Sequence, residues 1–104
     1  LVAVDDLGWV HAGTGGKATA ARLVAWPNKP GILSDWAQAV GDVRHPDPTT
    51  SAVMAEAMRR AAYESAAKAD CSVEILDVWR WGGNIFAPEL VEQVRAIASA
   101  RGYR

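Results

Sequence analysis

Cysteine is nearly absent from this sequence, since Cys71 is the single one among 104 residues. One cysteine cannot form a disulfide within the chain, so the default expectation is a reduced, cytoplasmic setting. The chain also has no apolar run of about 18 residues, the length that suggests a membrane span, and no charged leader followed by an apolar stretch. We therefore expect a soluble protein.

An excess of charge of either sign is missing as well. Eleven Lys and Arg oppose twelve Asp and Glu, which gives a formal net charge of −1, and no basic stripe runs along the chain. This balance argues against a nucleic-acid-binding surface, and the half-apolar composition argues against disorder. At 104 residues the chain has room for one domain with a modest core.

Hydrophobic periodicity predicts the strands. A weak strand over residues 2–10 is interrupted by Asp5, Asp6 and Gly8. Further strands are predicted over residues 18–26, 36–44 and 72–81. In the strand 36–44 one face carries only small side chains, including Gly41, and such a face can accept a helix closely.

Proline marks the start of two helices. Asp47 before Pro48 is typical of a helix start, and this helix should run to about Lys68. Pro88 opens a second amphipathic helix, which should end near Gly102. The element order indicates an α+β fold, with an antiparallel sheet of three to four strands and helices on one face.

Side chains that bind metals are few and scattered. His11, His45 and Cys71 share no ligand spacing and lie on three different predicted elements, so we expect no cofactor bound by this chain itself. The glycines before Lys17 do not match a phosphate-binding loop, because His11 stands where that loop needs its first glycine and Ala18 stands where it needs Ser or Thr.

Asp42 and Arg44 are two residues apart on a predicted strand and therefore project to the same face. They can form a structural ion pair, or Arg44 can present its planar guanidinium to the carboxylate of a ligand. His45 either ends the strand or takes part in the same anion site. Spacing alone leaves these alternatives open.

Several segments together resemble a known family. They are HAGT at 11–14, PNKPGILSDWAQAVGDVRHPDP at 27–48, VEILDVWRW at 73–81 and FAPELVEQVRAIASARGYR at 86–104. This order is similar to the lid or dimerisation domain of the zinc-dependent amidohydrolases that act on N-carbamoyl amino acids, ureidopropionate and allantoate, which are relatives of aminoacylases and metallocarboxypeptidases. The resemblance covers most of residues 18–104.

The resemblance implies a shortened, ferredoxin-like lid over residues 1–86, with its first helix missing, and a helix over residues 87–104 that leads back toward an absent catalytic domain. It implies that His11 stabilises an oxyanion during catalysis and that Arg44 binds the substrate carboxylate. Gly31 stands where the family has a substrate-binding asparagine. The zinc or manganese of the family would be held by the catalytic domain.

The implied partners are a second copy in a homodimer, the missing catalytic domain and a small carboxylate-bearing substrate. Since the chain starts at Leu1 without methionine, we expect a fragment. The resemblance implies that the metal-binding catalytic domain is missing from it, so we expect it to be inactive alone. The alternatives are a stand-alone protein-interaction module that uses exposed tryptophans, or a degenerate fragment without a catalytic role.

Overall fold

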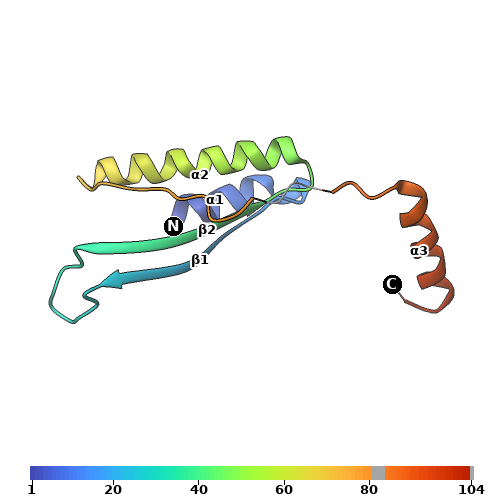
Figure 1. Ribbon diagram of the computed structural model, residues 1–104, viewed down its shortest axis with the longest axis horizontal. Helices are drawn as coiled ribbons and strands as arrows, with labels where there is room; N and C mark the ends of the chain where they lie inside the picture. The colour runs from blue at the N-terminus through green and yellow to red at the C-terminus, as the bar shows by residue number, and fades with distance from the viewer. Residues whose placement is uncertain (81–83, 104) are drawn as a thin grey trace.

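The structure, a computed structural model, describes residues 1–80 and 84–103. Its elements are α1 (Val2–His11), the 3-10 turn η1 (Ala12–Thr14), β1 (Lys17–Trp26), β2 (Trp36–Arg44), α2 (Pro48–Lys68) and α3 (Pro88–Ala100). Helices α1 and α2 lie over one face of the β1–β2 hairpin, and α3 stands apart from them (Figure 1). The predicted α+β class is confirmed. Within the described ranges, no helix is both long enough and apolar enough to cross a membrane.

Strands β1 and β2 form an antiparallel hairpin. Their register runs from Lys17 opposite Arg44 to Trp26 opposite Trp36, with a β-bulge at Ala21. The connection between them includes Gly31 in the left-handed region, at φ 75°. Across residues 1–80 and 84–103 the sheet holds these two strands, so the prediction of three to four strands is corrected.

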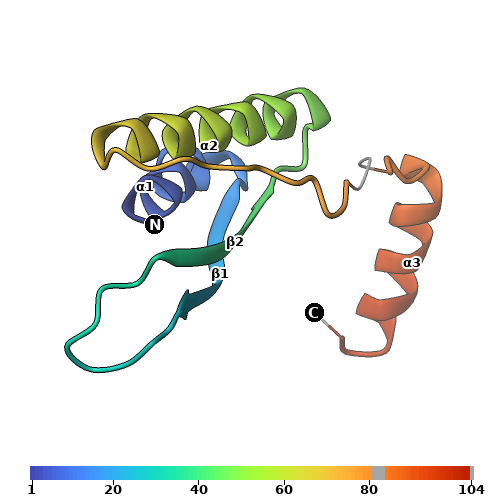
Figure 2. The ribbon, with the colours of Figure 1, turned by 60° about the vertical axis from the view of Figure 1, so that its left-hand side comes forward.

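The predicted strand over residues 72–81 is not formed in its described part. Residues 72–80 have no regular structure and run back beside α2 (Figures 1 and 2). Arg59 of α2 donates to Asp77 on this segment, and Arg80 lies 2.8 Å from the same carboxylate. A strand needs a neighbour to pair its backbone groups, and this segment lies against a helix instead. Trp81 lies outside the described residues.

Residues 2–10 form most of helix α1, so the prediction of a weak strand is wrong. The half-buried positions recur with helical spacing at Val4, Leu7, Gly8 and His11. Gly8 lies so close to β1 that an added Cβ would be 3.2 Å from the Ala18 nitrogen. The glycine that interrupts the apolar pattern is therefore the point where α1 approaches the sheet.

Helix α2 begins and ends as predicted. The Asp47 carboxylate accepts a hydrogen bond from the Thr50 nitrogen at 2.7 Å, which satisfies one amide of the first turn. On the side toward the sheet, Met54 is fully buried. Gly41 of β2 lies under Met58, because an added Cβ would be 2.7 Å from the Met58 sulfur. The small-residue face of β2 thus accepts a helix closely, as predicted.

Helix α3 has the predicted ends, but its apolar face is not inside. Leu90 is 57% exposed and Val94 is 67% exposed, so the apolar side of this amphipathic helix is not covered by the described residues. The radius of gyration is 19.0 Å, whereas a compact domain of this length has about 13 Å. The accessible surface is 8876 Å², against about 5,700 Å² for a compact monomer of the same mass. Much apolar surface is left uncovered.

Candidate functional site

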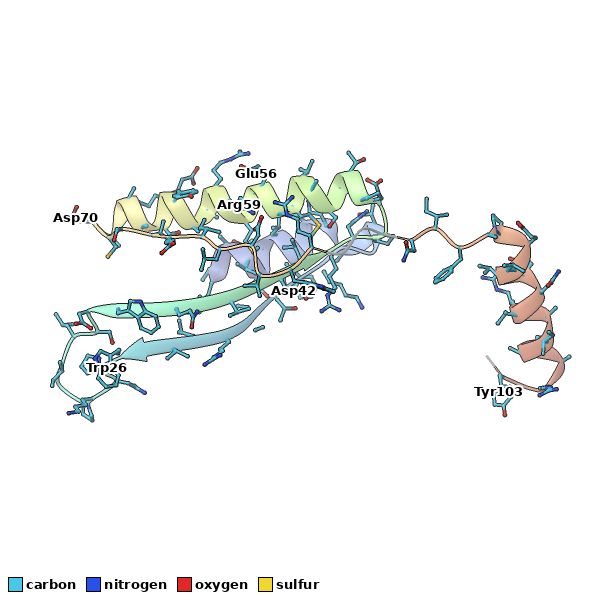
Figure 3. The ribbon with its side chains drawn as sticks, viewed as in Figure 1. Trp26, Asp42, Glu56, Arg59, Asp70 and Tyr103 are labelled. Atoms are coloured by element: carbon cyan, nitrogen blue, oxygen red, sulfur yellow. The ribbon has the colours of Figure 1, made fainter. Side chains whose placement is uncertain are left out.

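The end of β2 places Asp42 and Arg44 on the open face of the hairpin. Side chains alternate along a strand, and Gly41 faces Met58 of α2, so the neighbouring even-numbered residues of β2 point away from the helices. There, Lys17, Thr19 and Ala21 of β1 join Asp42 and Arg44 around a shallow depression of about 300 Å³. Figure 3 shows Asp42 near the helix-covered end of the hairpin.

Arg44 forms the ion pair that its spacing from Asp42 allows. Its Nε donates to Asp42 Oδ2 at 2.6 Å, and its Nη2 lies 2.6 Å from the same oxygen. The hydrogen bond to Asp42, and then the negative charge of Asp42, raise the pKa of the Arg44 guanidinium, which therefore stays charged. A guanidinium has five N–H donors, so one carboxylate oxygen does not use them all.

The surroundings of Arg44 favour an anion. Lys17 lies directly opposite Arg44 in the strand register, so two cations and the single carboxylate of Asp42 line the depression. The Arg44 side chain is 73% exposed. An exposed ion pair contributes little free energy, so a ligand carboxylate can compete with Asp42 for the guanidinium at small cost.

His11 is the last residue of α1 and lies in a tight turn. Its carbonyl oxygen accepts hydrogen bonds from the Gly16 nitrogen at 2.9 Å and the Thr14 hydroxyl at 3.0 Å. Gly16 is buried against His11, because an added Cβ would be 2.9 Å from the His11 oxygen and would also overlap the His11 Cβ. The HAGT segment and the glycines after it therefore fix the backbone at His11.

The structure brings the two histidines together, which the sequence analysis missed. Their ring centroids are 6.2 Å apart, with an interplanar angle of 80°. His45 Nε2 lies 3.0 Å from the Thr14 hydroxyl oxygen, across 31 positions of sequence. The signal was present in the strand prediction, because pairing 18–26 with 36–44 in a hairpin places the residues before the first strand next to those after the second.

His11 and Arg44 are not brought together within one chain. Arg44 shares the open face with Asp42, whereas the next residue, His45, turns to the end of α1. The residues that line the depression at Arg44 do not include His11. In the parts of the chain that the structure describes, no group of three or more His, Cys, Asp or Glu side chains could hold a metal ion.

A comparison with solved structures finds a crystal structure of an amidase of the hydantoinase/carbamoylase family from Burkholderia vietnamiensis. The TM-score is 0.83 and the sequence identity 28%, over 96% of this chain and 24% of that chain. This chain resembles part of a carbamoylase-family amidase. No family model matches the sequence, and a comparison with curated proteins finds no match.

This similarity agrees with the resemblance seen in the sequence, and it supports a relationship to a domain of the carbamoylase-family amidohydrolases. The chain spans about a quarter of the length of the Burkholderia amidase, the covered share being 24%. At 28% identity the likeness extends to the residues as well as to the fold.

Proposed function

We propose that the chain is the substrate-binding and subunit-contacting part of an amidohydrolase. The intact enzyme would cleave linear C–N bonds of N-carbamoyl amino acids, ureidopropionate or allantoate. The observation that carries this proposal is the similarity to the carbamoylase-family amidase over 96% of the chain. Residues 1–86 would form the lid, and residues 87–104, which include α3, would lead toward the catalytic domain.

In this proposal Arg44 binds the carboxylate of the substrate. The support is its exposed position beside Lys17, with guanidinium donors left over from the Asp42 contact. The planar guanidinium can meet both oxygens of a carboxylate at once, which a lysine ammonium cannot do. Asp42 then holds Arg44 in place before the substrate arrives.

His11 would stabilise the oxyanion that develops on the scissile carbonyl. Because Arg44 and the turn that carries His11 face different sides of the hairpin, the two residues would act in sites that are completed by other polypeptide, such as a second subunit. The zinc or manganese of the family finds no ligand set among the described residues and would be held by the catalytic domain, so we expect the isolated chain to be inactive.

Exposed apolar surface supports contacts with a second copy and with a catalytic domain. The tryptophans whose exposure the structure describes are 53–71% exposed: Trp9, Trp26, Trp36 and Trp79. Large aromatic side chains are enriched at protein interfaces, and wide exposed apolar patches are unusual on monomers. The same surface would also serve a stand-alone interaction module, which is the second candidate function.

A ligand titration tests the role of Arg44. We expect an N-carbamoyl amino acid to shift the NMR signals of Arg44 and Lys17, and the matching carboxamide, which lacks the carboxylate, to leave them in place. Arg44→Ala should abolish the shifts, and Arg44→Lys should not restore them. Arg22→Ala, which removes another exposed arginine of the hairpin, is the matched control and should bind normally.

Three outcomes would count against the proposal. An undiminished response in Arg44→Ala would remove the carboxylate-binding role, and a strictly monomeric mass in concentrated solution would remove the homodimer. Release of ammonia from N-carbamoyl substrates by the isolated chain with added zinc would contradict its expected inactivity.

A further inference from the structure

A series of hydrogen bonds connects the start of α2 to the end of α1. The Asp47 nitrogen donates to His45 Nδ1 at 2.9 Å, and His45 Nε2 lies 3.0 Å from the Thr14 hydroxyl oxygen. The Thr14 hydroxyl in turn donates to the His11 carbonyl oxygen at 3.0 Å. We call this series the His45–Thr14 relay.

The direction of each bond in the relay follows from the chemistry of its members. A backbone N–H can only donate, so His45 Nδ1 accepts from Asp47 and the proton of a neutral ring is on Nε2. Nε2–H then donates to Thr14, whose single hydroxyl proton is used on His11. The Asp47 carbonyl oxygen is farther from Nδ1, at 3.3 Å, so the shorter contact decides the tautomer.

Both ends of the relay are fixed. At one end Asp47 is the N-cap of α2, with its carboxylate bonded to the backbone and hydroxyl of Thr50 at 2.7 and 2.6 Å. At the other end Gly16 packs against His11 and also donates to the His11 carbonyl. His45 therefore connects a capped helix to the backbone of His11 across the helix-covered end of the hairpin.

We infer that His45 is a positioning residue for His11 and acts through the Thr14 hydroxyl. The geometry that carries the inference is the unbroken path from Asp47 to the His11 carbonyl, with the two rings 6.2 Å apart in an edge-to-face arrangement. The relay holds the last turn of α1 so that the His11 imidazole presents one orientation. The inference rests on the oxyanion role proposed for His11.

NMR spectroscopy of the full chain tests the relay without any ligand. We expect the His45 ring to show a protonated Nε2 and an unprotonated Nδ1. Thr14→Val removes the hydroxyl, so the His11 ring signals should move, and hydrogen exchange at the Gly16 amide should rise roughly tenfold, which is about the effect of losing one ordinary hydrogen bond. Thr14→Ser keeps the hydroxyl and should behave as the parent chain does.

The control is Thr49→Val, which removes an exposed hydroxyl from the first turn of α2 and leaves the relay intact. His45→Asn should keep an acceptor near Asp47 but lose the reach to Thr14, and should therefore resemble Thr14→Val. The inference is overturned if Thr14→Val leaves the His11 signals unchanged. It is also overturned if exchange rises equally at all amides, which would indicate a general structural role.

These readouts are independent of the proposed function. Failure of Arg44 to bind carboxylates would remove the substrate-binding proposal and leave the NMR result on His45 unaffected. A His45 ring protonated on Nδ1, together with normal carboxylate binding at Arg44, would overturn the relay alone.

Discussion

The two ends of the β1–β2 hairpin differ in what covers them. At the end that includes Gly41, α1 and α2 pack on the sheet, Gly41 lies under Met58, and the His45–Thr14 relay joins the two helices. The other end, where Figure 3 labels Trp26, diverges from the helices (Figure 2). There Leu23 is 59% exposed and Trp36 is 53% exposed. One hydrogen-bonded ladder thus continues from a supported region into an unsupported one.

This difference gives the two ends different roles: the helix-covered end stabilises the fold, and the other end is available for contact with another polypeptide. Tertiary packing supplies most of the stability of a short helix or hairpin, so the helix-covered end should hold the fold together. The other end leaves apolar side chains in water, and these favour a second copy or another domain. Arg44, His11 and His45 lie at the supported end, where the strand register pairs Arg44 with Lys17 and the two histidine rings are in contact.

The largest decrease in the free energy of unfolding is expected when the buried side chain of Met54 is removed. Met54→Ala removes its packing between α2 and the rest of the fold, and core changes of this kind lower the free energy of unfolding by about 2–5 kcal/mol. Leu23→Ala at the other end removes a similar side chain and should cost under about 1 kcal/mol, because surface changes are usually small. Urea unfolding of both variants measures the contrast. Equal losses would break the distinction between the two ends.

The next effect concerns the turn at His11. Gly16→Ala places a methyl group against the His11 Cβ and carbonyl oxygen, and overpacking of this kind costs about 1–3 kcal/mol. Gly13→Ala is the matched control, since nothing lies within 4 Å of the position its Cβ would take. Thermal unfolding should show a clear decrease for Gly16→Ala and almost none for Gly13→Ala. A tolerated Gly16→Ala would mean that the turn yields easily and that His11 is not held by it.

Local chemistry made some of the fold predictable. The start of α2 follows from Asp47 before Pro48, and the close approach of α2 follows from Gly41 among small neighbours, because a few adjacent residues decide each feature. The period of two along β2 likewise predicted that Asp42 and Arg44 share one face, where they form the ion pair that was one of the open alternatives.

Features that depend on distant segments were missed. Whether residues 72–80 form a strand depends on a free sheet edge, and Arg59 holds them beside α2 instead. Helix α1 was taken for a strand because the role of Gly8 is visible only once Ala18 lies next to it. The contact of His45 with Thr14 spans 31 positions and exists only through the hairpin register.

The smallest expected effect is a decrease of stability at acid pH. One source of it is the protonation of Asp47 at the helix-covered end. Hydrogen bonds from the Thr50 hydroxyl, and then from its backbone N–H, hold the pKa of the Asp47 carboxyl below its ordinary value. Two arginines, Arg59 first and then Arg80, lower the pKa of Asp77 in the same direction. The unfolded chain therefore binds these protons more readily than the folded chain does.

The lowered pKa values determine how stability changes as the pH falls. Both contributions are fully present above the unfolded carboxyl pKa of about 3.9 and are lost as the pH falls through the lower folded values. The melting temperature should thus be nearly constant near neutral pH and decline below about pH 4. Asp47→Asn keeps a capping oxygen but removes the titrating group, so the decrease in melting temperature at acid pH should become smaller. Asp77→Asn removes the second titrating group and should make this decrease smaller again. A decline of unchanged steepness in Asp47→Asn would show that the cap of α2, from which the relay starts, contributes nothing through its charge.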